Sequence, residues 1–326
     1  MDNKKKYLLQ TENLCKWFPA ASDLRHGFRP RYIKAVNGVS VNVMEGETLG
    51  VVGESGCGKT TFGRTVIKLE EPTGGRIIFD GCDITGYKHK EMQRIRSQIQ
   101  MIFQDPYASL DPRMHIGDCI GEPLDIQRIY TDKAIRRDNI TELMEICGLN
   151  GMDYDKYPHE FSGGQRQRIG IARALALKPR LLICDEPVSA LDVSIQAQLL
   201  NLMMKLQAEY NLTKIFISHD LSVISHVADR VAVMYLGKVV EMASKEEIFK
   251  NTMHPYTKAL LASVPVIGKH YSTQPQLLDG ELPSLVDLPE HCPLYGRCPF
   301  QDEKCLGPAP ELREISPDHY CSCHKV

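Results

Sequence analysis

The feature that most restricts the fold of this chain is the segment Gly53-Glu54-Ser55-Gly56-Cys57-Gly58-Lys59-Thr60. It fits the pattern G-x-x-x-x-G-K-[ST], follows the apolar run 49–52, and precedes a helical pattern over residues 61–69. Glycines let successive backbone N–H groups turn toward an anion, and the N-terminus of the following helix adds partial positive charge. The segment therefore predicts a phosphate-binding loop between a strand and a helix.

The side chains at the end of this loop suit a nucleotide and its magnesium ion. Lys59 can reach the β- and γ-phosphates, and the hydroxyl of Thr60 can bind Mg²⁺. The residues expected to contact the nucleotide are Gly53, Glu54, Ser55, Gly56, Cys57, Gly58, Lys59, Thr60 and Thr61.

Short apolar runs alternate with amphipathic helical patterns along most of the chain. The runs 49–52, 181–184 and 215–217 are continuous, as expected of strands buried on both faces of a parallel sheet. Helical faces lie between them, formed by Ile140, Leu143, Met144 and Cys147 and by Ile195, Leu199, Leu202, Met203 and Leu206. This alternation predicts an α/β fold.

Two acids, Asp185 and Glu186, directly follow the run 181–184. Carboxylates at the end of a buried strand are costly unless they are used, and α/β proteins bind ligands at that edge of the sheet. We expect Asp185 to hold Mg²⁺ through water and Glu186 to act as the general base toward the attacking water. The alternative is that the pair only stabilises the dipole of a helix N-terminus before Pro187.

Three further features are weak signals when each is considered alone. The segment Ser162-Gly163-Gly164-Gln165 opens a helical pattern over residues 166–177 and reads as a capping box. Gln104 follows the apolar run 101–103, and His219 follows the run 215–218. A lone glutamine or histidine after a strand is more often structural than catalytic.

The order of these features is what distinguishes the chain. The phosphate-binding loop is followed by Gln104, Phe161-Ser162-Gly163-Gly164-Gln165, Asp185-Glu186, Ser189-Ala190-Leu191-Asp192 and His219. This series resembles the ATPase subunit of ABC transporters, with Phe161 replacing the usual leucine, a change that should preserve the packing. The resemblance implies a P-loop NTPase fold of the ABC cassette type at residues 7–254, with a RecA-like core and a helical subdomain at about 105–165.

The resemblance also implies an ATPase in which two such domains face head to tail around two ATP molecules. Catalysis would then involve Glu186, His219 and Gln104, and Mg²⁺ would be held by Thr60, Gln104 and Asp185. The γ-phosphate bound by the partner chain would be contacted by Ser162, Gly163, Gly164 and Gln165, and Asp192 would bridge the dimer. Phe18 aligns with the aromatic side chain that stacks on adenine, with Phe28 and Tyr32 as alternatives because the loop 19–32 is long.

Further segments resemble oligopeptide and dipeptide importers, so that the resemblance covers nearly the whole chain. They are residues 104–114, continuing to 122–124, and His254-Pro255-Tyr256-Thr257. The similarity is closest to the F-type ATPase subunit of these permeases, and it implies coupling of ATP hydrolysis to uptake of di- or oligopeptides. No motif contacts the solute, so nickel or another small solute remains an alternative.

The implied partners are a second, homologous ATPase subunit, two integral membrane permease subunits and, indirectly, an extracytoplasmic solute-binding protein. The chain would lie peripherally on the cytoplasmic side of the cell membrane, since it has no signal peptide and no run of about 18 apolar residues. A soluble ABC-type ATPase acting on nucleic acid or ribosomes is the rival of another class. The chain has one cassette and no heptad insert, and 39 Lys and Arg against 41 Asp and Glu give a net charge of −2, so no nucleic-acid partner is expected.

Prolines are concentrated near the C-terminus, where ten of the 19 lie at or beyond Pro255. This density excludes long helices and central strands. We expect an extension with the His-Pro-Tyr motif and a Pro-rich linker at 255–290, then a small, loop-rich, Cys-rich unit at 291–326. Its low hydrophobic content makes it dependent on cross-linking through cysteines.

Cysteines are also concentrated there, with five of the 11 in the last unit and six scattered singly before it. The odd, scattered count argues against a secreted disulfide framework. The spacing Cys292-x5-Cys298-x6-Cys305-x17-Cys323 matches neither zinc ribbons nor bacterial ferredoxins, which leaves zinc, iron–sulfur and plain thiols open. In the resembling family this end can hold a [4Fe–4S] cluster, which implies these four cysteines as ligands, with Cys321 as the competing fourth.

Overall fold

The computed structural model of the chain describes residues 6–20, 31–263, 278, 280, 283–286 and 288–326. Phe28 and most of the Pro-rich linker lie outside the described residues. The chain forms two compact units. Unit 1 comprises Met1–Val43, Glu47–Thr85 and Ile217–Val326, and unit 2 comprises Met44–Gly46 and Gly86–Phe216.

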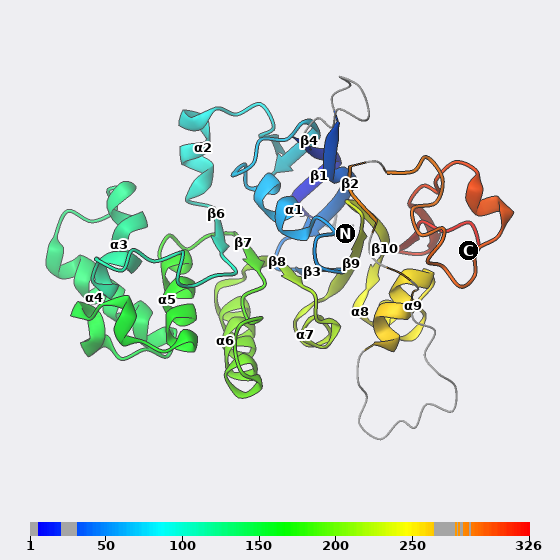
Figure 1. Cartoon of the computed structure of the whole chain (residues 1–326). Coiled ribbons are helices and arrows are strands. Elements are labelled where there is room, and N and C mark those ends of the chain that lie inside the picture. Colours follow the sequence, from blue (N-terminus) through cyan, green and yellow to red (C-terminus); the bar gives the residue numbers. More distant parts are fainter. Residues whose placement is uncertain (1–5, 21–30, 264–277, 279, 281–282, 287) are drawn as a thin grey trace, which may run out of the picture. The chain divides into compact units, whose positions relative to one another are not determined.

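Unit 1 contains a small sheet with the strand order β2-β1-β4-β5 (Figure 1). The strands are β1 (Tyr7–Pro19), β2 (Tyr32–Met44), β4 (Gly74–Phe79) and β5 (Cys82–Asp83). β4 runs antiparallel to both β1 and β5, and the register of β1 with β4 shifts between Glu12 and Cys15. Fully buried leucines of β1, such as Leu8 and Leu14, contribute to the core of this unit.

Unit 1 also contains strands in the order β11-β12-β10-β9-β3. They are β3 (Thr48–Val52), β9 (Arg230–Tyr235), β10 (Lys238–Ser244), β11 (Arg313–Ser316) and β12 (His319–Cys321). β3 and β9 are parallel and buried, which confirms the strand expected at 49–52, whereas β10, β11 and β12 pair antiparallel. The helices are α1 (Lys59–Val66), α7 (Leu221–Val227), α8 (Lys245–Lys250) and α9 (Pro255–Ala262), with the 3₁₀ turn η4 (Glu303–Leu306).

Unit 2 has strands in the order β8-β7-β6, of which β6 and β7 are parallel. They are β6 (Ile99–Ile102), β7 (Leu181–Asp185) and β8 (Thr213–Ser218), whose end belongs to unit 1. Every residue of β7 and β8 is buried, as predicted for strands covered on both faces.

The helices of unit 2 include the two amphipathic patterns expected from the sequence. They are α2 (His89–Arg96), α3 (Ile116–Ile126), α4 (Lys133–Ile146), α5 (Gly163–Leu175) and α6 (Val193–Tyr210), with 3₁₀ turns η2 (Gly151–Asp155) and η3 (Pro158–Glu160). α4 buries Ile140 and Met144, and α6 buries Leu199, Met203 and Leu206. None of the described helices is both long and apolar enough to cross a bilayer.

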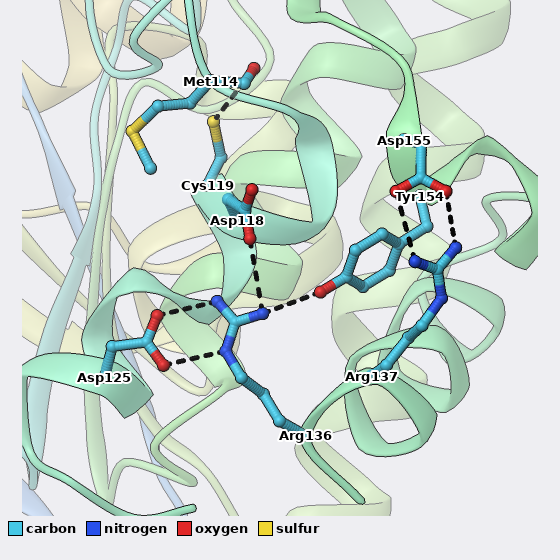
Figure 2. A network of polar contacts seen from close by, with 8 residues as sticks. All are labelled: Met114, Asp118, Cys119, Asp125, Arg136, Arg137, Tyr154 and Asp155. Atoms are coloured by element: carbon cyan, nitrogen blue, oxygen red, sulfur yellow. Dashed lines mark hydrogen bonds and ion pairs between the residues drawn. The ribbon is translucent and has the colours of Figure 1, made fainter. Parts of the chain in front are cut away.

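An arginine fastens the helices α3 and α4 to the turn η2 (Figure 2). Arg136 donates to both carboxylate oxygens of Asp125, at 2.8 and 2.7 Å, to Asp118 at 3.4 Å and to the hydroxyl of Tyr154 at 2.7 Å. Glycine on α3 leaves room for this approach, since a Cβ at Gly121 would lie 2.2 Å from Nη2 of Arg136 and the arginine side chain would have to shift. Packing and charge pairing therefore set the geometry of this group of helices together.

The C-terminal region (residues 291–326) departs from the expectation that its proline density excludes central strands. β12 lies between β10 and β11, pairing with both, so that expectation is wrong for this strand. The reason is local: Pro317 and Asp318, whose φ is +58°, form the turn between β11 and β12, so no proline interrupts His319–Cys321.

A buried polar contact joins the same strand to β10. The Nε2 atom of His319 lies 2.9 Å from Oε1 of Glu241, and both side chains are fully buried. The same carboxylate accepts from the backbone N–H groups of Met253 and His254. None of the 11 cysteines forms a disulfide, and sheet pairing and this contact contribute to holding the region.

Candidate functional site

The phosphate-binding loop follows β3 and leads into α1, as its sequence predicts. Gly58 is the N-cap residue of α1, and the loop glycines Gly53, Gly56 and Gly58 have φ values of +154°, +80° and +108°. A Cβ at Gly53 would lie 2.2 Å from the carbonyl oxygen of Met234, and one at Gly58 would lie 2.0 Å from that of Ala35. Two of the three glycines are therefore required by space as well as by backbone conformation.

Lys59 is buried within this loop. Its Nζ atom donates to the carbonyl oxygens of Gly53 at 2.8 Å and Glu54 at 2.9 Å, and only 4% of the residue is exposed. Thr60 and Thr61 are half-buried, whereas Ser55 is exposed. The lysine charge thus lies directly against the backbone that the sequence predicts will surround a phosphate group.

The two cysteines inside nucleotide motifs are buried packing residues. Burial raises the pKa of Cys57, against the opposing effect of Lys59, and burial raises the pKa of Cys184 to about 12. Both thiols therefore stay protonated near neutral pH and carry no nucleophilic chemistry.

In unit 2 the acidic pair at the end of β7 lies beside Gln104. Asp185 is fully buried at the end of β7, and Glu186 follows it with a φ of +45°. The side-chain amide of Gln104 donates to Oε2 of Glu186 at 3.2 Å. Ser189 donates through its hydroxyl to the Glu186 carbonyl at 3.1 Å, which shapes the turn after the strand.

The segment after Phe161 begins α5 with the capping box that the sequence indicates. Ser162 accepts from the backbone N–H of Gln165 at 3.3 Å, and Gln165 accepts in return from the N–H of Ser162 at 2.9 Å. A Cβ at Gly164 would lie 2.5 Å from Cγ2 of Ile195, so the segment packs closely on α6. Phe161 itself is 5% exposed, which confirms that it packs in the core.

The remaining predicted residues belong to both units. His219 is exposed just after β8 and belongs to unit 1, and Asp192 is the N-cap residue of α6, accepting from the N–H of Ile195 at 3.0 Å. Phe18 is half-buried at the end of β1, with Nζ of Lys16 lying 4.8 Å from its ring centroid. Tyr32 is 42% exposed and packs against Trp17, with 6.3 Å between ring centroids.

Sequence reasoning missed two contacts of the phosphate-binding loop. Arg297 pairs with the carboxylate of Glu54, and the Tyr256 hydroxyl accepts from the Glu54 backbone N–H. Tyr235 contacts both partners, since its hydroxyl accepts from Arg297 and its ring packs against Tyr256. Tyr256 belongs to the His-Pro-Tyr motif, whose resemblance to importers says nothing of this contact. No spacing rule connects residues so distant in the chain.

The four cysteines expected as ligands line one small pocket. Cys292, Cys298, Cys305 and Cys323 lie around it with His254, whereas Cys321 is buried in β12 and is not among its lining residues. Within the described part of the chain, however, no three His, Cys, Asp or Glu side chains form a group that could hold a metal ion. The thiols therefore converge without forming a single-ion site.

Comparison with known proteins identifies an ABC cassette followed by a transporter C-terminal region. Residues 36–189 match the family model described as ABC transporter, and residues 240–305 match that described as oligopeptide/dipeptide transporter, C-terminal region. A dimeric structure of an ATP-binding cassette in a post-hydrolysis state, bound to ADP and Pi, has a TM-score of 0.65 at 27% identity, covering 73% of this chain and 98% of that one.

Named relatives are similar over nearly their whole length. The oligopeptide transport ATP-binding protein AppF of Bacillus subtilis is 51% identical, covering 97% of this chain and 97% of the relative. The oligopeptide transport ATP-binding protein OppF of Salmonella typhimurium is 50% identical, covering 99% of this chain and 97% of the relative. The chain therefore belongs to the family of ABC transporter ATP-binding proteins of the oligopeptide and dipeptide type.

Proposed function

We propose that this chain is the ATP-hydrolysing subunit of a membrane importer for di- or oligopeptides. The observation that carries the proposal is the union, in one chain, of an ABC cassette with the C-terminal region of oligopeptide and dipeptide transporters. Relatives such as AppF and OppF carry oligopeptide transport in their names and match 97% and 99% of this chain. ATP and Mg²⁺ are the cofactors that such a cassette uses.

The side chains of the motifs take the following roles. Lys59 binds the β- and γ-phosphates together with the backbone N–H groups of its loop, and Glu186 accepts a proton from the attacking water, which Gln104 orients. Thr60, Gln104 and Asp185 are the residues that would hold Mg²⁺, which would supply positive charge to the phosphates when bound. His219 contacts the γ-phosphate, and Phe18 stacks on adenine. Support comes from the buried Lys59 ammonium and from the contact between Gln104 and Glu186.

The site is completed by a second ATPase subunit. Ser162 to Gln165 contact the nucleotide of that partner, since small glycines at a helix N-terminus allow close approach to an anion. ATP binding closes the dimer and hydrolysis reopens it, and two permease subunits turn this movement into transport at the cytoplasmic face of the membrane. A solute-binding protein delivers the peptide from the other side.

The four thiols of the C-terminal region hold an iron–sulfur cluster. Their convergence on one pocket, with Cys323 rather than Cys321 as the fourth, supports this assignment. A single zinc ion, with bonds to sulfur of about 2.3 Å, needs thiols grouped closely around one point, and no such group occurs in the described residues. A [4Fe–4S] cluster would be held by four cysteine thiolates, the number that lines this pocket. When bound, the cluster supplies a cross-link between loops.

Transport is tested by the Lys59→Ala variant of the complete transporter. Loss of the buried ammonium weakens ATP binding and lowers uptake of a radiolabelled tripeptide to background. Arg64→Ala, an exposed basic residue on the same helix, is the matched control and retains uptake. Uptake of ⁶³Ni²⁺ in place of the peptide would overturn the substrate assignment but leave the ATPase assignment intact.

The cluster is tested by anaerobic purification followed by iron and sulfide analysis. About four irons and four sulfides per chain are expected, and they should be lost in Cys323→Ser but kept in Cys321→Ser. A colourless protein without iron would contradict the cluster.

A further inference from the structure

Glu54 in the phosphate-binding loop is held at three points. Its backbone N–H donates to the Tyr256 hydroxyl at 2.8 Å, and its carbonyl oxygen accepts from Nζ of Lys59 at 2.9 Å. Its carboxylate accepts from both terminal nitrogens of Arg297, each at 3.1 Å. The loop residue is thus tied to its own lysine on one side and to elements near the C-terminus on the other.

Arg297 is itself well anchored. Its side chain is only 10% exposed, and its Nη1 atom also donates to the Tyr235 hydroxyl at 3.2 Å. The rings of Tyr235 and Tyr256 pack at 4.6 Å, so the two hydroxyls that bracket Glu54 and Arg297 belong to one aromatic pair. A planar guanidinium that binds a carboxylate through two nitrogens fixes its orientation, which a lysine cannot do.

The backbone around Arg297 is a compact turn between two cysteines. The N–H groups of Arg297 and Cys298 both donate to the carbonyl of Leu294, at 3.0 Å each, and Leu294 is 2% exposed. The N–H of Tyr295 donates to the carbonyl of Cys292 at 3.0 Å. The turn is therefore ordered by its own hydrogen bonds and presents Arg297 to the phosphate-binding loop.

We propose that Arg297 is a positioning residue for nucleotide binding, which neutralises the Glu54 carboxylate and fastens the phosphate-binding loop to the C-terminal region. The inference rests on the proposed function, because it assigns a control element to the same phosphate site. In this proposal the turn from Cys292 to Cys298 stabilises the phosphate-binding loop, in addition to the contacts made by the cassette motifs.

The physical reason is electrostatic as well as geometric. A carboxylate in a loop that binds phosphates repels the negatively charged nucleotide, and this repulsion is strong where water is partly excluded. Arg297 cancels that charge and holds the carboxylate through two hydrogen bonds. Removing the guanidinium leaves the carboxylate uncompensated and the loop free to shift.

Equilibrium binding of MgADP to the full-length chain tests the proposal, since ADP contacts the loop but is not hydrolysed. Arg297→Met should weaken binding about tenfold, equivalent to about 1.4 kcal/mol, and Arg297→Lys about threefold. Adding Glu54→Gln to Arg297→Met should restore affinity to within about threefold of wild type, because the uncompensated charge is then removed. Lys304→Met, an exposed cation of the C-terminal region, is the matched control and binds as wild type.

Hydrolysis by the complete transporter supplies a readout that a general loss of stability would not reproduce. Arg297→Met should raise the KM for ATP about tenfold and change kcat less than about twofold, since the chemical groups stay in place. If Arg297→Met fails to fold, Glu54→Gln alone carries the test: it should tighten MgADP binding about twofold, because an unpaired guanidinium then lies near the phosphates.

Two results would overturn the inference: MgADP affinity of Arg297→Met within twofold of wild type, or no recovery in the double variant. Failure of the wild-type chain to bind MgADP would instead overturn the proposed function. The two failures are therefore distinguishable.

Discussion

The side-chain amide of Gln104 donates to the carboxylate of Glu186, with 3.2 Å between Nε2 and Oε2. The contact follows from strand register, since β6 and β7 are parallel and Ile102 pairs with Cys184. Gln104 lies two residues beyond Ile102, and Glu186 lies two residues beyond Cys184. Both residues therefore lie at the same edge of the sheet, opposite each other. Parallel pairing thus brings together the two residues that the order of motifs had only associated.

This contact leads to a prediction for Glu186→Gln. The amide keeps a hydrogen-bonding group opposite Gln104 but cannot accept a proton from water, so ATP binding is retained. Turnover at this chain's own site falls about 10²- to 10⁴-fold. The measurement is ATP hydrolysis by the transporter after the partner ATPase site has been silenced, with Glu142→Gln, on the exposed surface of α4, as the control. Unchanged turnover would exclude Glu186 as the general base.

The glycines of the phosphate-binding loop differ in how much space a side chain would have. Gly58→Ala places a Cβ against the Ala35 carbonyl oxygen, at 2.0 Å before any shift, and should destabilise unit 1 by about 3 kcal/mol or more. Gly56→Ala has positive φ as well but no heavy atom within 4 Å of the new Cβ, so only backbone strain of about 1 kcal/mol is expected. Denaturant unfolding without nucleotide compares them, and equal losses would show that space is not the deciding term.

Neighbouring arginines on α4 form a matched pair in unit 2 (Figure 2). Arg136 is 13% exposed and binds Asp125, Asp118 and Tyr154, whereas Arg137 is 51% exposed and binds Asp155. Arg136→Met should lower the free energy of unfolding by about 2 kcal/mol, because it removes a largely buried guanidinium and leaves the hydroxyl of the buried Tyr154 without its donor. Arg137→Met should have a smaller effect, since water solvates its pair with Asp155 and the main loss is the contact of its guanidinium with the Tyr154 ring, 4.2 Å from the centroid. Similar losses in both variants would contradict the role assigned to burial.

His254 predicts how stability depends on pH. Burial lowers its pKa from 6.5 to about 4, against a smaller opposing effect of the Ser322 backbone. Above about pH 6.5 both folded and unfolded states hold it neutral, so its contribution is fully present there. As the pH falls from 6.5 toward 4, His254 binds a proton in the unfolded state but not in the folded state. The free energy of unfolding therefore decreases, by about 2 kcal/mol at pH 5.

The control for this titration is His254→Asn. Asparagine can still cap α9, where His254 accepts from the N–H of Tyr256 at 3.1 Å, but it does not titrate. The free energy of unfolding of this variant should fall less between pH 7 and pH 5 than that of wild type. An equal fall in both proteins would assign the acid loss to other groups.

The sequence alone determined the phosphate-binding loop, the strand before it and the helix after it, because each depends on local chemistry. A segment of some fifteen residues encodes the apolar strand, the three glycines with positive φ and the N-terminus of the helix. The structure has each of them at the predicted position. The capping box at Ser162 is local in the same way.

Only the tertiary structure decided what surrounds that loop. Glu54 and Arg297 are 243 residues apart, and their pairing depends on the path of the chain through β9, β10 and the C-terminal region. The same path makes β12 an interior strand, and it brings Cys323 rather than Cys321 to the pocket of thiols. Local patterns specify conformation because they involve neighbouring atoms. Contacts between distant segments depend on how the whole unit packs, which no single motif encodes.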